Sequence, residues 1–157
     1  MPAHSIDDFD RRILQTLQIE GRLSNTELAG RIGLSDTPCL RRLKRLEQDG
    51  IIQGYRAVLD RAAIGLGLTV FIMIEALDHS PEWLQRFTGV VSGMPEVMEV
   101  HRMAGDVDYL LRVAVADMAA FDAFYRRLIE AVPLKNVSSH FAMERVKSTT
   151  AFPIDAA

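Results

Sequence analysis

The chain has 157 residues, 48% of them hydrophobic and 25% charged, and a net charge of −3. This composition is that of an ordinary globular protein and excludes a largely disordered chain. The longest uncharged apolar run covers residues 64–74, which is too short for a membrane span, and the N-terminus lacks the apolar stretch of a signal peptide. Because the single Cys39 permits no internal disulfide and no cysteine-rich metal site, we expect a cytoplasmic protein without metal or other cofactor.

The net charge hides a basic segment in the first third of the chain. Residues 1–60 carry nine Lys or Arg and nine Asp or Glu, but residues 31–45 hold five basic residues against Asp36 alone, a local charge of +4. Such a focused basic patch on an otherwise acidic protein suits contact with phosphates. Double-stranded DNA is therefore a candidate partner.

Two helices are predicted before residue 34. Asp7 or Asp8 caps the first, whose apolar residues recur with helical spacing until Gly21 ends it. The run Ser-Asn-Thr-Glu at 24–27 is a capping box, in which the serine side chain binds the glutamate amide and the glutamate side chain reaches back. It starts a second, short helix that ends at Gly33.

The third predicted helix, residues 35–49, follows almost at once, with Ser35 as its cap. Two short helices joined so tightly are typical of a helix-turn-helix, whose second helix enters the major groove of DNA. Leu40, Leu43 and Leu46 are expected to face inward. Long charged side chains cover many helices without any function, but the helix-turn-helix context favours DNA contact here. The predicted DNA contacts are Ser35, Thr37, Pro38, Arg41, Arg42, Lys44 and Arg45.

Residues 51–58 are predicted to form a strand, which adds a wing to this unit. Residues 60–67 contain two glycines that interrupt any periodicity, so we expect a linker or hinge there. The chain therefore divides into a winged helix-turn-helix DNA-binding domain at 1–59 and a second domain at 68–157.

The second domain is predicted to contain two helices and four strands. In chain order they are a strand at 68–77, a helix at 82–91, strands at 97–103 and 109–115, a helix at 118–128 and a strand at about 137–146. The order strand, helix, strand, strand, helix, strand is that of a ferredoxin-like βαββαβ sandwich. The whole chain is thus expected to have an α+β fold.

The first strand of this sheet is apolar on both faces, with Val70, Ile72 and Ile74 on one and Phe71 and Met73 on the other. The two helices of a ferredoxin-like sandwich cover only one face of its sheet. An exposed apolar sheet is rarely tolerated in a soluble monomer, so we expect a homodimer. A dimer also suits the first domain, because paired recognition helices read half-sites about one helical turn apart.

Several segments, in their order and spacing, resemble one known family. They are Asp10-Arg11-Arg12-Ile13-Leu14, Leu34-Ser35, Pro38-Cys39-Leu40-Arg41-Arg42-Leu43, Leu46-Glu47, Gly50-Ile51-Ile52 and Gly105-Asp106-Val107-Asp108-Tyr109-Leu110-Leu111. On these segments the chain resembles the Lrp/AsnC family of bacterial regulators over about residues 6–150. The resemblance implies a C-terminal module that senses amino acids or related metabolites, with the effector bound between such modules. It also implies dimers that assemble into octamers or similar rings, wrap DNA and associate with the nucleoid.

The same resemblance implies where the effector binds. In that family the pocket surrounds a glycine-aspartate turn and its flanking strands. The matching residues are Met103, Ala104, Gly105, Asp106 and Asp108, with His140, Phe141, Ala142 and Met143 expected as neighbours on the facing strand. At least one of the two aspartates is expected to bind the ammonium group of the effector, although turn formation is an alternative role for Asp106.

Other chemistry is weakly supported. Cys39 is either a redox switch near a helix N-terminus or a buried thiol, and its inward spacing favours the second. His101 and His140 lack partners at metal-ligand spacing, and no catalytic residues are predicted, so an enzyme is disfavoured. Two functions stay open: a transcription regulator of amino-acid metabolism controlled by an amino-acid effector, and an architectural DNA-wrapping protein with little ligand control.

Overall fold

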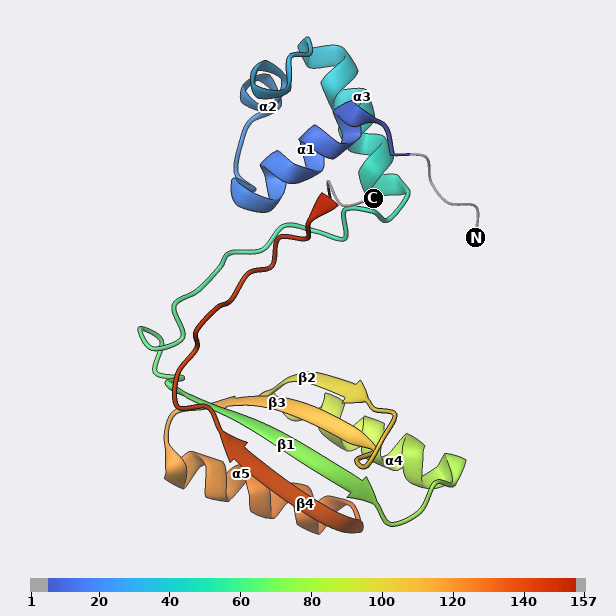
Figure 1. Ribbon diagram of the computed structural model, residues 1–157, viewed down its shortest axis with the longest axis vertical. Helices are drawn as coiled ribbons and strands as arrows, with labels where there is room; N and C mark the ends of the chain where they lie inside the picture. Colours follow the sequence, from blue (N-terminus) through green and yellow to red (C-terminus); the bar gives the residue numbers. More distant parts are fainter. Residues whose placement is uncertain (1–5, 155–157) are drawn as a thin grey trace. The chain divides into compact units, whose positions relative to one another are not determined.

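The computed structural model describes residues 6–154, which form two compact units (Figure 1). The N-terminal unit contains residues 6–58 together with residues 147–154, and the C-terminal unit contains residues 59–146. The chain therefore leaves the N-terminal unit, builds the C-terminal unit and returns.

Three helices build the N-terminal unit. They are α1 (Asp8–Ile19), α2 (Asn25–Ile32) and α3 (Asp36–Gln48). Both predicted helix starts are confirmed: Asp7 caps α1 in a capping box with Asp10, and Ser24 caps α2 in a capping box with Glu27. Gly33 ends α2 with a φ of 77°, a left-handed conformation that glycine adopts without a steric penalty.

The core of the N-terminal unit lies between the three helices. On α3, Cys39 and Leu46 are fully buried and Leu43 packs against the same cluster. The predicted inward role of Leu40 is wrong, because its side chain is 40% exposed. Positions 39, 43 and 46 follow the i, i+4, i+7 spacing of one helix face, and Leu40 lies beside that face.

The predicted strand over residues 51–58 is not formed. The structure shows an irregular segment there, with no strand assigned between α3 and residue 68. Its fixed points are the Ile52 N–H, which donates to the carbonyl of Leu46 at 3.0 Å, and the Tyr55 hydroxyl, which donates to Glu47 at 2.9 Å. An isolated extended segment without a partner strand has no ladder to join, so the wing is a loop bound to the end of α3.

The last described residues belong to the N-terminal unit. The Phe152 N–H donates to Oε1 of Gln18 at 2.6 Å, and Nε2 of Gln18 donates to the Phe152 carbonyl at 3.2 Å. Ile154 packs against the hydrophobic cluster of this unit. The structure thus differs from the predicted division, which assigned all of residues 68–157 to the second domain, because α1 binds the returning chain.

The C-terminal unit is a four-stranded antiparallel sheet with two helices. Its elements are β1 (Leu68–Ala76), α4 (Pro81–Ser92), β2 (Val97–Arg102), β3 (Tyr109–Val115), α5 (Met118–Ala131) and β4 (Leu134–Phe141). The strand order is β2-β3-β1-β4, and each neighbouring pair is antiparallel. The predicted ferredoxin-like sandwich and the α+β class are confirmed.

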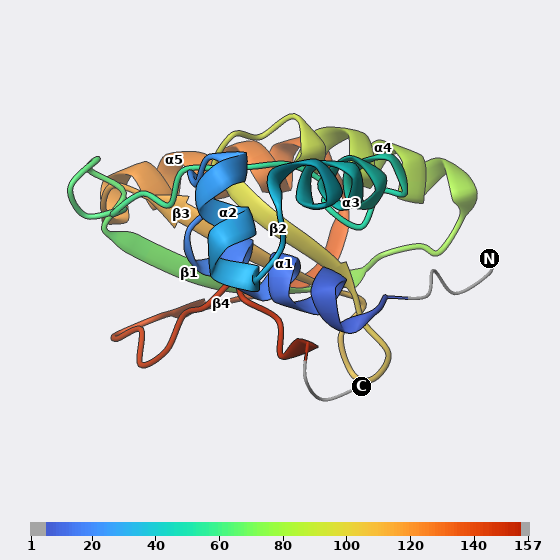
Figure 2. The same cartoon turned by 90° about the horizontal axis from the view of Figure 1, so that it is seen from above.

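The two helices lie on one face of the sheet, as Figure 2 shows from above. Phe87 of α4, Phe124 of α5 and Leu111 of β3 are fully buried in the core between the helices and the sheet. On the opposite face of β1, Phe71 and Met73 are each 36% exposed. The expected uncovered apolar face is therefore present in the single chain.

The last strand differs from its predicted range of 137–146. It begins at Leu134 and ends at Phe141, and the final bond between the segments runs from the Ala142 N–H to the Thr69 carbonyl at 3.0 Å. Because β1 starts at Leu68, it offers no partner to the chain beyond this point. The end of β4 is thus set by its neighbour rather than by its own residues.

Candidate functional site

The junction between α2 and α3 is fixed by side chains of the first turn of α2. Thr26 Oγ1 donates to a carboxylate oxygen of Asp36 at 2.6 Å, and Asn25 Nδ2 donates to the Asp36 carbonyl at 2.9 Å. The Leu34 N–H donates to the Ala29 carbonyl at 3.0 Å. These bonds hold the start of α3 against the start of α2 and limit the movement of one helix relative to the other.

The outward face of α3 carries Thr37, Leu40, Arg41 and Lys44, all exposed. These positions recur at three- and four-residue spacing and therefore share one side of the helix. Among residues 6–154, neither Arg41 nor Lys44 has a hydrogen-bond or ion-pair partner. Two positive charges are thus presented side by side and unneutralised.

Two further predicted contacts lie at the start of α3. Ser35 occupies the N-cap position and is exposed, but its side chain makes no capping hydrogen bond, so the hydroxyl group is available to a ligand. Pro38 is half-buried in the first turn. The two residues lie at the end of α3 that precedes the exposed basic side chains.

Arg42 and Arg45 are already paired within the N-terminal unit. Arg42 Nη1 lies 2.5 Å from Oδ2 of Asp7 and 2.9 Å from Oδ1 of Asp10, and Arg45 binds Oδ2 of Asp10. The guanidinium group of Arg42 also lies over the ring of Phe9, 5.4 Å from its centre. The hydrogen bond from the Asp10 N–H lowers the pKa of Asp7. Desolvation acts in the opposite direction, and Arg42 lowers this pKa further.

The two acidic partners at the start of α1, Asp7 and Asp10, were not predicted from the sequence. Asp10 is fully buried and lies one turn before Ile13 and Leu14, on the inward face of α1. A charged residue on an inward face is rarely buried without a partner of opposite charge. That placement is the sequence signal that would have pointed to a basic partner on another helix.

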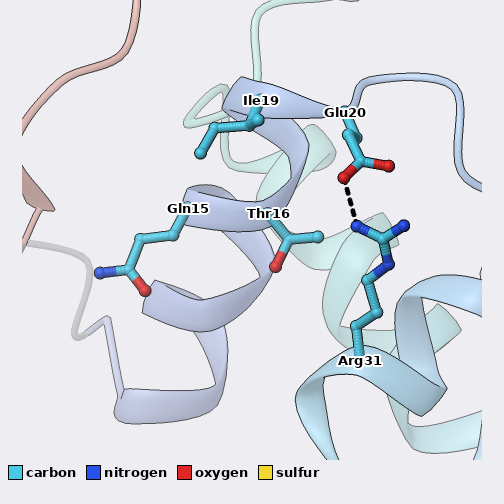
Figure 3. A pocket seen from close by; sticks show the side chains of 5 residues that line it. All are labelled: Gln15, Thr16, Ile19, Glu20 and Arg31. Carbon is cyan, nitrogen blue, oxygen red and sulfur yellow. Dashed lines mark hydrogen bonds and ion pairs between the residues drawn. The ribbon is translucent and has the colours of Figure 1, made fainter.

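A third basic residue, Arg31, is paired with an acidic residue at a shallow hollow between α1 and α2. Figure 3 shows Arg31 of α2 reaching Glu20 at the end of α1, beside Gln15, Thr16 and Ile19. The hydrogen bond from Arg31 holds the pKa of Glu20 below its ordinary value. Of the five basic residues at 31–45, only the two on the outward face of α3 are therefore unpaired within the described chain.

The predicted glycine-aspartate turn joins β2 to β3. Gly105 has a φ of 134°, which other residues rarely adopt. The Asp108 carboxylate accepts the Ala76 N–H at 2.8 Å, and the Asp108 N–H donates to the Ile74 carbonyl at 2.9 Å. Asp108 thus ties the turn to the end of β1, whereas Asp106 is exposed.

The remaining residues of the turn are open to solvent. Met103 is 40% exposed, Ala104 is exposed, and the Met103 N–H donates to the Asp108 carbonyl at 2.8 Å. His79 Nε2 lies 3.9 Å from the second carboxylate oxygen of Asp108. One oxygen of the Asp108 carboxylate is therefore bound to the backbone, whereas the more exposed carboxylate of Asp106 has no hydrogen-bond or ion-pair partner among residues 6–154.

His140, Phe141 and Ala142 lie at the other end of β1. His140 is opposite Phe71 and Phe141 is opposite Val70, so about six residues of strand, or about 20 Å, separate them from the turn at 103–108. Phe141 packs edge-on against Phe121 with ring centres 5.1 Å apart. The expected neighbourhood of the two groups is wrong within one chain, because β4 runs antiparallel to β1.

Over residues 6–154, every helix is too short or too polar to span a lipid bilayer. Within the same stretch, no three His, Cys, Asp or Glu side chains come together in a way that would hold a metal ion. The recognisable chemistry of the chain is thus the unpaired basic face of α3 and the exposed turn at 103–108.

A helix-turn-helix with an unpaired basic face, followed by a ferredoxin-like unit, defines a two-part DNA-binding protein. Residues 6–53 match the family described as winged helix-turn-helix DNA-binding, and residues 69–152 match the Lrp/AsnC ligand binding domain. The chain belongs to the Lrp/AsnC family of transcriptional regulators, as its sequence motifs predicted.

Full-length relatives agree with this assignment. The chain is 52% identical to the DNA-binding transcriptional activator DecR of Escherichia coli over 151 residues, which cover 96% of this chain and 99% of DecR. The crystal structure of an AsnC family regulator from Agrobacterium tumefaciens is 51% identical, with a TM-score of 0.92 over 95% of this chain and 97% of that one. A Neisseria meningitidis transcriptional regulator in complex with L-Met is 38% identical, with a TM-score of 0.92 and coverage of 96% and 98%.

Proposed function

We propose that the protein is a sequence-specific regulator of genes of amino-acid metabolism, whose C-terminal unit binds a small amino acid and thereby controls DNA binding. The observation that carries the DNA part is the outward face of α3, where Arg41 and Lys44 are exposed and have no partner within residues 6–154. Unpaired cations on the second helix of a helix-turn-helix lie where the major groove is read.

The chemistry of this face suggests a division of roles. Arg41 has a planar fork of donors that matches O6 and N7 of guanine, so we assign it to base reading. Lys44, with the hydroxyls of Ser35 and Thr37, suits phosphate oxygens, which fix register without reading sequence. Pro38 shapes the first turn of α3. Arg42 and Arg45 bind the carboxylates of Asp7 and Asp10 and so attach α3 to the start of α1.

For the effector we propose the turn at 103–108 with Asp106 as the partner of the ligand ammonium group. Asp106 is exposed, whereas the carboxylate of Asp108 accepts the Ala76 N–H. Since His140 to Ala142 lie at the far end of β1, they join the same pocket only if a second copy of the chain supplies them. The Neisseria regulator that was crystallised with L-Met supports an amino acid as the ligand class.

The open sheet face supports the assembly that such a pocket needs. Phe71 and Met73 are each 36% exposed there, and apolar surface of this kind is stabilised by contact with a second copy. We propose that dimers formed through the C-terminal units pair the recognition helices, and that dimers associate further into a ring such as an octamer.

DNA affinity measurements on single variants test the DNA part. Arg41→Ala and Lys44→Ala, on duplexes selected from a random pool by the wild-type protein, are expected to weaken binding by at least about tenfold. Lys44→Ala should also reduce the slope of log affinity against log salt by about 0.9, because it removes a phosphate contact, whereas Arg41→Ala should leave that slope nearly unchanged. Arg126→Ala on α5 removes the same charge from the other unit and is the control. Wild-type affinity and slope for both α3 variants would refute the assignment.

Thermal shift tests the effector part. A ligand that binds only the folded protein raises the unfolding temperature, so one or a few of the common amino acids at millimolar concentration should do so in the wild type. Asp106→Asn is expected to abolish the shift, and Asp122→Asn on the exposed surface of α5 is the control. If no amino acid shifts the wild type, the effector part fails and an architectural DNA-wrapping protein becomes the better description.

A further inference from the structure

Among the described residues of the N-terminal unit, Asp10 has the most buried charge. Its side chain is 0% exposed, and each of its oxygens accepts from a different arginine of α3. An unpaired carboxylate would be very costly in that position. Asp10 therefore holds both Arg42 and Arg45 against α1, although 32 and 35 residues separate it from them.

This pairing changes the charge that α3 presents to a ligand. The segment 41–45 contains four basic residues, and two of them end on carboxylates of α1. Arg45 still has 46% of its side chain exposed and follows Arg41 by one helical turn, so it lies beside the DNA-reading face. Without Asp10, its guanidinium group would be free to reach a phosphate.

Sequence-independent DNA affinity comes almost entirely from cations that contact phosphates. Sequence selectivity is the ratio of specific to non-specific affinity, so cations that bind any duplex lower it. We propose that Asp10 is a selectivity-determining residue that withholds Arg45, and together with Asp7 also Arg42, from the DNA backbone, so that Arg41 and Lys44 make the DNA contacts of this face. The inference rests on the proposed DNA binding by α3.

The test compares Asp10→Asn with Asp8→Asn. Both substitutions remove one negative charge from the first turn of α1, but Asp8 is 88% exposed and pairs only with Arg11 in the described chain. Affinity is measured for a mixed-sequence duplex and for duplexes selected by the wild type, between about 50 and 200 mM salt.

Asp10→Asn is expected to release Arg45, since Arg42 keeps its ion pair with Asp7, and to steepen the salt slope on mixed-sequence DNA by about 0.9 for each arginine released. This is about a threefold larger change in affinity across that salt range per arginine. The ratio of selected to mixed-sequence affinity should fall, while Asp8→Asn should keep both values of the wild type. A merely structural role of Asp10 would weaken both affinities without steepening the slope, and that result would overturn the inference.

A second pair of variants decides the matter if Asp10→Asn does not fold. Arg45→Gln leaves Asp10 paired with Arg42, and Lys44→Gln removes an unpaired charge at the preceding position of α3. We expect Lys44→Gln to reduce the salt slope by about 0.9 and Arg45→Gln to leave it unchanged; an equal reduction for both would overturn the inference. Absence of DNA binding by the wild type would instead refute the proposed function.

Discussion

Replacing Gln18 by alanine is expected to release the returning end of the chain from α1. The side-chain amide of Gln18 accepts the Phe152 N–H at 2.6 Å and donates to the Phe152 carbonyl at 3.2 Å. A hydrogen bond contributes about 0.5 to 1.5 kcal/mol net, and both bonds are solvent-exposed, so we expect a loss of about 1 to 2 kcal/mol. That change raises the fraction of detached segment by about 5- to 30-fold.

Hydrogen exchange of the full chain measures this detachment directly. In the wild type the Phe152 amide is protected by its bond to Gln18, so peptides covering residues 147–154 should exchange faster in Gln18→Ala by the factor given above. Gln18→Glu keeps an acceptor for that amide but loses the donor to the carbonyl, and its effect should be smaller. Gln85→Ala on α4 is the control. Equal exchange at Phe152 in the wild type and Gln18→Ala would refute the reasoning.

Two further properties follow from burial and charge. Cys39 is fully buried and its burial raises the pKa of the thiol, so an aromatic disulfide reagent should label it only after denaturation; rapid labelling of the native protein would contradict this. The Ser24 hydroxyl and N–H lower the pKa of Glu27 below 4.5, so this carboxylate stabilises the fold above that pH and stops doing so as the pH falls through its folded-state pKa. Thermal unfolding of Glu27→Gln should therefore show a smaller loss of stability between about pH 5 and 2 than the wild type, and an equal loss in the two proteins would contradict this.

The elements that the sequence predicted best are those whose ends depend on nearby residues. Ser24 and Glu27 form the expected capping box of α2, and β3 has its predicted bounds of Tyr109–Val115. Strand β4 was misplaced because its end depends on Thr69, more than seventy positions earlier in the chain. The sequence of residues 51–58 is typical of a strand. A strand also needs a neighbouring strand to pair with, however, and the local sequence pattern does not show whether one is present.

The candidate DNA surface was predicted as a set, but its internal division was not. Arg41 and Arg42 are adjacent and chemically identical, and only the fold shows that Arg42 meets Asp7 and Asp10 while Arg41 has no partner in the described chain. The candidate effector residues show the same limit. Strand register, which a single sequence does not reveal, sets the 103–108 turn and His140 at opposite ends of β1.

The return of the chain gives the C-terminal unit two connections to the N-terminal unit, one covalent through residues 59–67 and one non-covalent through residues 147–154, which bind α1. Both leave the sheet at the same place, because the Ala142 N–H donates to the Thr69 carbonyl at the start of β1 and the end of β4. One connection continues towards α3 and the other ends on Gln18 of α1. A ligand that contacts the proposed effector residues at 140–142 acts on the strand pair from which both connections start. Detaching Phe152 from Gln18 breaks the non-covalent connection and leaves the sheet itself intact, so we expect Gln18→Ala to weaken the proposed control of DNA binding without weakening the proposed ligand binding.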